Sequence, residues 1–111
     1  MSELTEYTVN FLKVLADQTR LQILEMLQES EQTQEDITKA LDKSQSTISQ
    51  QLKTLMSSDI VTYEKKDNVK NYRIKAPEVL KIIEIIKSFV VKLNKDKFTN
   101  IRDFDVLDIL F

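Results

Sequence analysis

The spacing of apolar residues predicts four helices in the first half of the chain. The predicted helices cover residues 4–16, 19–29, 34–41 and 45–57. Each of the last three helices is preceded by a residue whose side chain can cap its N-terminus. These residues are Asp17, Thr33 and Ser44. Asp36 follows Thr33 at the position from which an acid can bond back to the cap.

The period changes after Asp59, and the pattern there predicts a β-hairpin. Residues 60–66 and 69–75 are rich in β-branched and aromatic side chains, with Asp67 and Asn68 between them. That dipeptide suits a two-residue turn in which both residues take positive φ. Pro77 then starts a long apolar helix that reaches about residue 96.

The predicted fold is therefore mainly α with one β-hairpin, in the order α-α-α-α-β-β-α. With 111 residues, the chain suits a single domain. We expect a domain at residues 1–97, followed by an apolar C-terminal extension at 98–111 that packs on the domain or on a dimer. The charges repeated along the long helix argue against a membrane span.

The composition excludes several kinds of site. The chain has no histidine, cysteine or glycine, which excludes imidazole and thiolate metal ligands, histidine general bases and phosphate-binding glycine loops. No pair of carboxylates stands out, so we expect no enzyme, no cofactor and no metal site. The N-terminal sequence MSELTEYTVN shows no secretory signal, and we expect a cytoplasmic protein. Left-handed backbone positions must fall to Asn and Asp.

The net charge of −2 conceals an uneven distribution. Residues 1–42 carry nine acids against three basic residues, a net charge of −6. Residues 43–75 carry seven basic residues against three acids, a net charge of +4, and residues 76–111 are balanced. A basic face of this kind can bind a polyanion even when the whole chain is mildly acidic.

The fourth predicted helix has an unusual polar face. Its apolar side chains Ile48, Leu52 and Leu55 point one way, and the opposite side carries hydroxyls, amides and lysines without any acid. A helix in the DNA major groove needs this chemistry, because amides and hydroxyls bond base edges and lysines offset phosphate charge. A solvated surface helix is the alternative. The candidate contacts on this face are Ser46, Thr47, Ser49, Gln50 and Lys53.

The hairpin that follows has basic side chains around its turn, and a short turn joins the two preceding helices. This is the organisation of a winged helix-turn-helix, in which the wing contacts phosphates or the neighbouring minor groove. An edge ribbon that uses lysines to prevent aggregation is the alternative. The candidate wing contacts are Lys65, Lys66, Lys70, Asn71 and Arg73.

The sequences LADQTRLQILEMLQE and SQSTISQQLKTLMSSDIV, with the lysine-rich hairpin, resemble the winged-helix repressors of the ArsR/SmtB family over roughly residues 10–92. The resemblance implies that Ser44, Gln45, Ser46, Ser49 and Gln50 are the principal DNA-reading positions. It also implies a homodimer joined through the first and last helices. The family's sensor sites use cysteines, histidines and carboxylates, and the first two are absent here. We therefore expect no familiar thiol or imidazole sensor, and a carboxylate-only site is the alternative.

The long helix is apolar over most of its circumference, more than a domain of this size can cover. We therefore expect part of it to meet a second copy, although a central core helix would show the same pattern. The expected dimer interface contains Tyr7, Phe11, Leu12, Leu15, Ile82, Ile83, Ile86, Phe89, Val90 and Leu93.

The sequence thus predicts a homodimeric, sequence-specific DNA-binding transcriptional regulator, with double-stranded DNA and a second copy as partners. We expect a repressor that occupies a palindromic operator, controlled by its abundance or by a protein partner. The competing hypothesis is a winged-helix protein-interaction subunit of a transcription or chromatin assembly with little direct DNA readout.

Overall fold

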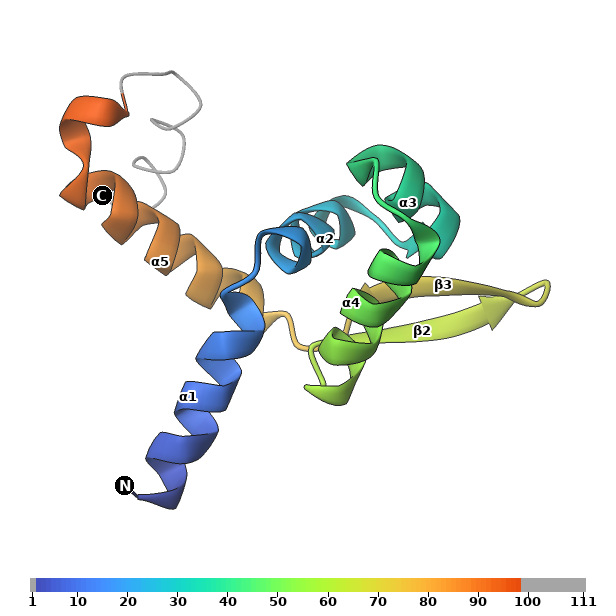
Figure 1. Ribbon diagram of the computed structural model, residues 1–111, viewed down its shortest axis with the longest axis horizontal. Helices are drawn as coiled ribbons and strands as arrows, with labels where there is room; N and C mark the ends of the chain where they lie inside the picture. The colour runs from blue at the N-terminus through green and yellow to red at the C-terminus, as the bar shows by residue number, and fades with distance from the viewer. Residues whose placement is uncertain (1, 99–111) are drawn as a thin grey trace. The chain divides into compact units, whose positions relative to one another are not determined.

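The computed structural model describes residues 2–98, and these form five α-helices, three strands and one 3-10 turn (Figure 1). The helices are α1 (Glu3–Leu15), α2 (Gln18–Glu29), α3 (Gln34–Leu41), α4 (Gln45–Ser57) and α5 (Glu78–Leu93). The strands are β1 (Gln32–Thr33), β2 (Val61–Lys66) and β3 (Val69–Ile74), and the 3-10 turn is Lys95–Lys97. The predicted order of helices and hairpin is confirmed, with β1 as an addition.

The chain divides into two compact units, residues 1–76 and 77–111. The first holds α1 to β3 and the second holds α5 and the 3-10 turn. Of the predicted C-terminal extension at 98–111, all but Phe98 lies outside the described residues.

The three predicted caps all form. The Asp17 carboxylate accepts a 2.9 Å hydrogen bond from the backbone N–H of Arg20, and the Ser44 hydroxyl accepts one of 3.1 Å from Thr47. Thr33 and Asp36 bond reciprocally, each side chain accepting from the other's backbone N–H at 3.1 Å. Each cap satisfies a donor that the helix itself leaves without a partner.

Every residue with positive φ among the described residues is Asp or Asn, as the absence of glycine requires. Asp42 (52°) ends α3, and Asp59 (59°) follows α4. Asp67 (52°) and Asn68 (64°) form the predicted two-residue hairpin turn, across which Lys66 faces Val69. Short polar side chains tolerate this backbone region better than other non-glycine residues do.

The sheet has the strand order β1-β3-β2, and both pairings are antiparallel. The two residues of β1 pair with Tyr72 and Asn71 of β3, so the segment before α3 closes the outer edge of the hairpin. In Figure 1 the hairpin turn lies beyond α3 and α4, while α1 leads away from α2 as an arm.

The core of the first unit joins the end of α1, α2, α3, α4 and the base of the hairpin. Its buried apolar side chains are Leu15, Ile23, Leu24, Leu27, Ile37, Ile48, Leu52, Leu55, Ile60, Val61 and Tyr72. Ile48, Leu52 and Leu55 are each at most 1% exposed, which confirms the predicted inner edge of α4. Burying each such side chain contributes about 1.5–3 kcal/mol, so the rotation of α4 about its axis is fixed.

Candidate nucleic-acid interface

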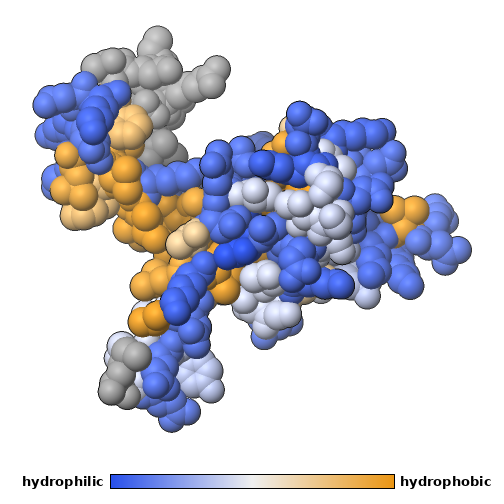
Figure 2. Space-filling model, viewed as in Figure 1, coloured by the Kyte–Doolittle hydropathy of each residue, from blue (hydrophilic) through white to orange (hydrophobic). Residues whose placement is uncertain are grey.

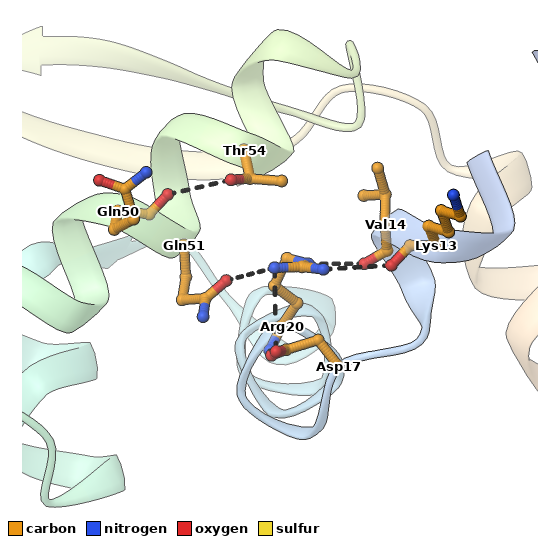
Figure 3. Close-up of polar contacts among 7 residues, drawn as sticks. All are labelled: Lys13, Val14, Asp17, Arg20, Gln50, Gln51 and Thr54. Carbon is orange, nitrogen blue, oxygen red and sulfur yellow. Dashed lines mark hydrogen bonds and ion pairs between the residues drawn. The ribbon is translucent and has the colours of Figure 1, made fainter. Parts of the chain in front are cut away.

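The face of α4 opposite its buried edge is open to solvent. Gln45, Ser46, Thr47, Gln50 and Lys53 are exposed, whereas Ser49 is half-buried. No acid occurs from Lys43 to Ser58, so this face carries only hydroxyl, amide and ammonium groups. The amide of Gln50 points away from the helical body (Figure 3). Amides held this way can bond two atoms of a base edge in the major groove.

Three of the predicted contact residues, Ser44, Ser46 and Thr47, already have hydrogen bonds to one another at the start of α4. The Ser44 hydroxyl accepts from the Thr47 backbone N–H and donates to the Thr47 hydroxyl at 2.8 Å. It also shares a 3.2 Å hydrogen bond with the hydroxyl of Ser46. Ser44 therefore acts mainly as the cap that begins the helix. The side chains that are freest to contact a ligand are those of Gln45, Gln50 and Lys53.

Gln34 connects the start of α4 to the wing. Its side-chain amide donates a 3.1 Å hydrogen bond to the backbone carbonyl of Gln45. The same residue lines an open hollow of about 420 Å³ between the start of α3 and the hairpin, where Lys65, Asn68 and Lys70 form part of the opposite wall. The start of α4 and these two lysines thus belong to one continuous surface.

The wing cations divide between the two faces of the hairpin, because successive side chains of a strand point to opposite faces. Lys65 and Lys70 are directly opposite each other on the face that also carries Tyr63 and Tyr72. The ammonium of Lys70 lies 4.7 Å from the centre of the Tyr63 ring, and the Tyr63 and Tyr72 rings are 5.6 Å apart. Among the residues that the structure describes, neither lysine forms an ion pair.

The other face carries Lys66 and Arg73, and both are paired with acids. The Lys66 ammonium lies 2.9 Å from the Glu31 carboxylate, and the Arg73 guanidinium lies 3.5 Å from Glu64. The hydrogen bond from Lys66 holds the pKa of Glu31 below its usual value, and the same bond raises the pKa of Lys66. Asn71, on this face, is half-buried and donates to the Val69 carbonyl at 3.2 Å. The positive charge of this face is therefore largely offset locally.

Glu31, Gln34 and Tyr63 were not among the candidates taken from the sequence. Glu31 and Lys66 are 35 positions apart, and no periodicity relates them. The pairing of β1 with β3, which brings Glu31 to the wing, rests on two residues without a strand pattern. No sequence pattern marks Gln34 or Tyr63, because their places beside the wing lysines depend on how the hairpin packs against α3.

The predicted interface residues fall into exposed and buried groups. Leu15 and Ile83 are buried, at 6% and 8% exposure, and Phe11 is half-buried. The exposed members are Tyr7, Leu12, Ile82, Ile86, Phe89, Val90 and Leu93. Leu4 and Ile85, which were not predicted, are exposed as well, at 76% and 58%. Apolar side chains gather along α5 in Figure 2.

Within residues 2–98, no group of three or more acids is arranged to hold a metal ion. None of the described helices has the length and apolar character needed to cross a membrane.

Comparison with known proteins gives both a family and a fold. The family model described as bacterial regulatory protein, arsR family, matches residues 17–63, which run from the cap of α2 into β2. The chain is 32% identical over 87 residues to the transcriptional activator HlyU of Vibrio cholerae, and the match covers 78% of this chain and 81% of HlyU.

Two solved structures have closely similar folds. One is the homodimeric winged helix-turn-helix DNA-binding domain of Mb0332 from Mycobacterium bovis, which is described as a possible ArsR-family transcriptional regulator. It is 25% identical to this chain with a TM-score of 0.73, and the match covers 90% of this chain and 95% of that one. Rv0081 from M. tuberculosis is 24% identical with a TM-score of 0.81, over 87% of this chain and 98% of that one. The second likeness concerns the fold alone.

Proposed function

The chain belongs to the ArsR family of bacterial regulatory proteins, and we propose that it is a homodimeric repressor that occupies a palindromic DNA operator. The family and its relatives are transcriptional regulators rather than enzymes, and the fold is their DNA-binding winged helix-turn-helix. The proposal adds the residues that contact DNA, the dimer interface and the direction of regulation.

The observation that carries the proposal is the acid-free outer face of α4. Gln45 and Gln50 are exposed there and read bases, assisted by the hydroxyls of Ser46 and Thr47. Lys53 contacts phosphate. A carboxylate on this face would be repelled by the DNA backbone, and none is present from Lys43 to Ser58.

The wing supplies phosphate contacts next to α4. Lys65 and Lys70 are the principal ones, because they share the hollow with Gln34 and form no ion pair within the described part of the chain. Lys66 and Arg73 contribute less, since Glu31 and Glu64 offset their charges. This surface is mainly hydrophilic over α3, α4 and the hairpin (Figure 2).

The dimer forms through α1 and α5, so that residues 1–97 act as one DNA-binding and dimerisation domain. Ile82, Ile86, Phe89 and Leu93 follow one another at intervals of three or four residues along α5, and all are at least 40% exposed. A stripe of this kind packs against a partner helix. The similar domain of Mb0332 is a homodimer. A two-fold dimer would present two copies of α4 to successive major grooves.

Selection of bound fragments from a pool of random duplexes tests the proposal. We expect enrichment of inverted repeats whose half-sites are about one helical turn apart. Binding to the enriched duplex should weaken steeply with salt, with a log–log slope of several units from released counterions. No enrichment and a flat salt response would instead support the protein-interaction module.

The direction of regulation needs a separate test, because the relative HlyU is named an activator. A reporter gene placed behind a promoter that overlaps the enriched sequence should lose expression when the full chain is produced. Increased expression would contradict repression and leave operator binding intact.

A further inference from the structure

Arg20 joins three helices of the first unit (Figure 3). From α2, its guanidinium donates to the backbone carbonyls of Val14 at 2.6 Å and Lys13 at 3.1 Å, both in the last turn of α1. It also donates a 2.6 Å hydrogen bond to the side-chain oxygen of Gln51 on α4. The Arg20 side chain is only 16% exposed.

The contacts at α1 complete the end of that helix. The last four carbonyls of a helix lack partners within it. Here the Leu12 and Leu15 carbonyls accept from Ala16 and Asp17, and those of Lys13 and Val14 accept from Arg20. A cation is also favoured at a helix C-terminus by the helix dipole. The end of α1 is thus held firmly to α2 by one side chain.

The contact at α4 extends this attachment to the DNA-facing helix. Gln51 is half-buried and lies beside the exposed Gln50, and both line a shallow hollow on the outside of α4 together with Ser46 and Thr47. Figure 3 shows Gln51 directed toward Arg20 and Gln50 directed away from it. The planar guanidinium donates in fixed directions, so it couples the two helices more rigidly than an ammonium could.

We propose that Arg20 and Gln51 are positioning residues that fix the angle between α1 and α4, and thereby the separation of the two α4 helices in the dimer. The proposal rests on the proposed function, because α1 carries the exposed residues Tyr7 and Leu12 of the proposed interface. With the link intact, the dimer accepts one half-site spacing. Without it, each protomer still reads its half-site but the dimer tolerates displaced spacings.

The variant Gln51→Met tests the link, because it removes the acceptor, keeps a similar volume and leaves the contacts of Arg20 with α1 in place. The probes are the palindromic duplex enriched from the random pool, versions of it with one to three base pairs inserted or removed between the half-sites, and a single half-site. Gln51→Glu restores an acceptor, and Gln28→Met on the exposed side of α2 is the matched control.

For wild type and Gln28→Met we expect about tenfold tighter binding to the best spacing than to displaced ones, a typical size for coupling between sites. Gln51→Met should reduce this ratio to about threefold or less with single-half-site affinity within about twofold of wild type. Gln51→Glu should keep the ratio, even if its charge lowers affinity for every duplex. If Gln51→Met preferred the best spacing over displaced ones by the same ratio as wild type, the positioning role of Arg20 and Gln51 would be overturned and operator binding would stand. If wild type did not bind the duplex at all, both the positioning role and the proposed function would be overturned.

Discussion

The ammonium of Lys66 lies 2.9 Å from the carboxylate of Glu31, and this pair joins the wing to the residue before β1. Both side chains are partly exposed, at 53% and 36%, so the pair adds little to stability. Its effect on charge matters more, because an anion beside a cation reduces that cation's attraction for phosphate.

We therefore predict that Glu31→Gln tightens binding to every duplex. The change releases the charge of Lys66 and should raise the magnitude of the log–log salt slope by up to about one unit. Equilibrium titrations of a labelled duplex at several salt concentrations measure both quantities. Glu25→Gln, which removes an exposed acid of α2, is the control. Equal gains from both variants would show that only net charge matters.

The two faces of the wing should respond differently to loss of a lysine. Lys65→Ala or Lys70→Ala should weaken all duplexes by the same factor and reduce the salt slope by about one unit. Lys66→Ala should have a smaller effect, because Glu31 already offsets its charge. The same titrations provide the comparison. A larger loss for Lys66→Ala than for Lys70→Ala would reassign the DNA-facing side of the hairpin.

Gln50 should affect sequence preference rather than general affinity. We predict that Gln50→Ala costs about 1–3 kcal/mol at one base pair of the operator and leaves binding to random DNA nearly unchanged. Competition between the enriched duplex and its single-base variants measures the loss. If wild type and variant ranked all of these duplexes identically, Gln50 would not read a base.

Phe89 should be central to the dimer, since it is 58% exposed on the apolar stripe of α5. A carboxylate there would be buried without a partner in the dimer, so Phe89→Glu should raise the dimer dissociation constant at least about tenfold. Sedimentation velocity over a concentration series measures this constant. Lys81→Glu, at an exposed polar position of the same helix, should leave it unchanged. A dimer of Phe89→Glu as stable as wild type would exclude the α5 interface.

The capping box of α3 should be visible in stability. Thr33→Ala removes an N-cap and should lower the free energy of unfolding by about 1 kcal/mol, as measured by chemical denaturation. The Thr33 backbone N–H donates to Asp36 and lowers the pKa of that carboxyl below its usual value of 3.8.

The pH dependence of the cap has a definite sign. A carboxyl whose pKa is lowered on folding stabilises the protein above its unfolded pKa, and this contribution disappears as the pH falls through the folded value. The stability difference between wild type and Asp36→Asn should thus be full at pH 7 and shrink below pH 3.8. A difference that did not change with pH would exclude the carboxylate as its source.

The local features of the fold were predictable because they depend on neighbouring residues. Asp17, Thr33 and Ser44 cap their helices as expected, and Asp67 and Asn68 form the expected turn. The buried edge of α4 follows from the helical spacing of its apolar residues. With one side buried, the direction of its polar face was also determined by the sequence.

The features that the sequence did not predict depend on residues far apart in the chain. β1 forms because β3 offers it an edge, and two residues carry no strand pattern of their own. The Arg20–Gln51 bond spans 31 positions and the Glu31–Lys66 pair spans 35. The sequence likewise grouped the wing cations together, whereas the strand register separates Lys65 and Lys70 from Lys66 and Arg73.

The most direct measurement is the duplex affinity of a variant with acids on the outer face of α4. Ser46→Glu combined with Gln50→Glu places two carboxylates there without changing the buried edge. Gln18→Glu combined with Gln28→Glu, which adds two acids at exposed positions of α2, is the control. At low salt the double variant should bind both operator and random DNA at least about a hundredfold more weakly than wild type, because like charge repels phosphate. Its helix content and dimer should be unaltered. Affinity equal to that of the control would contradict the assignment of this face to DNA.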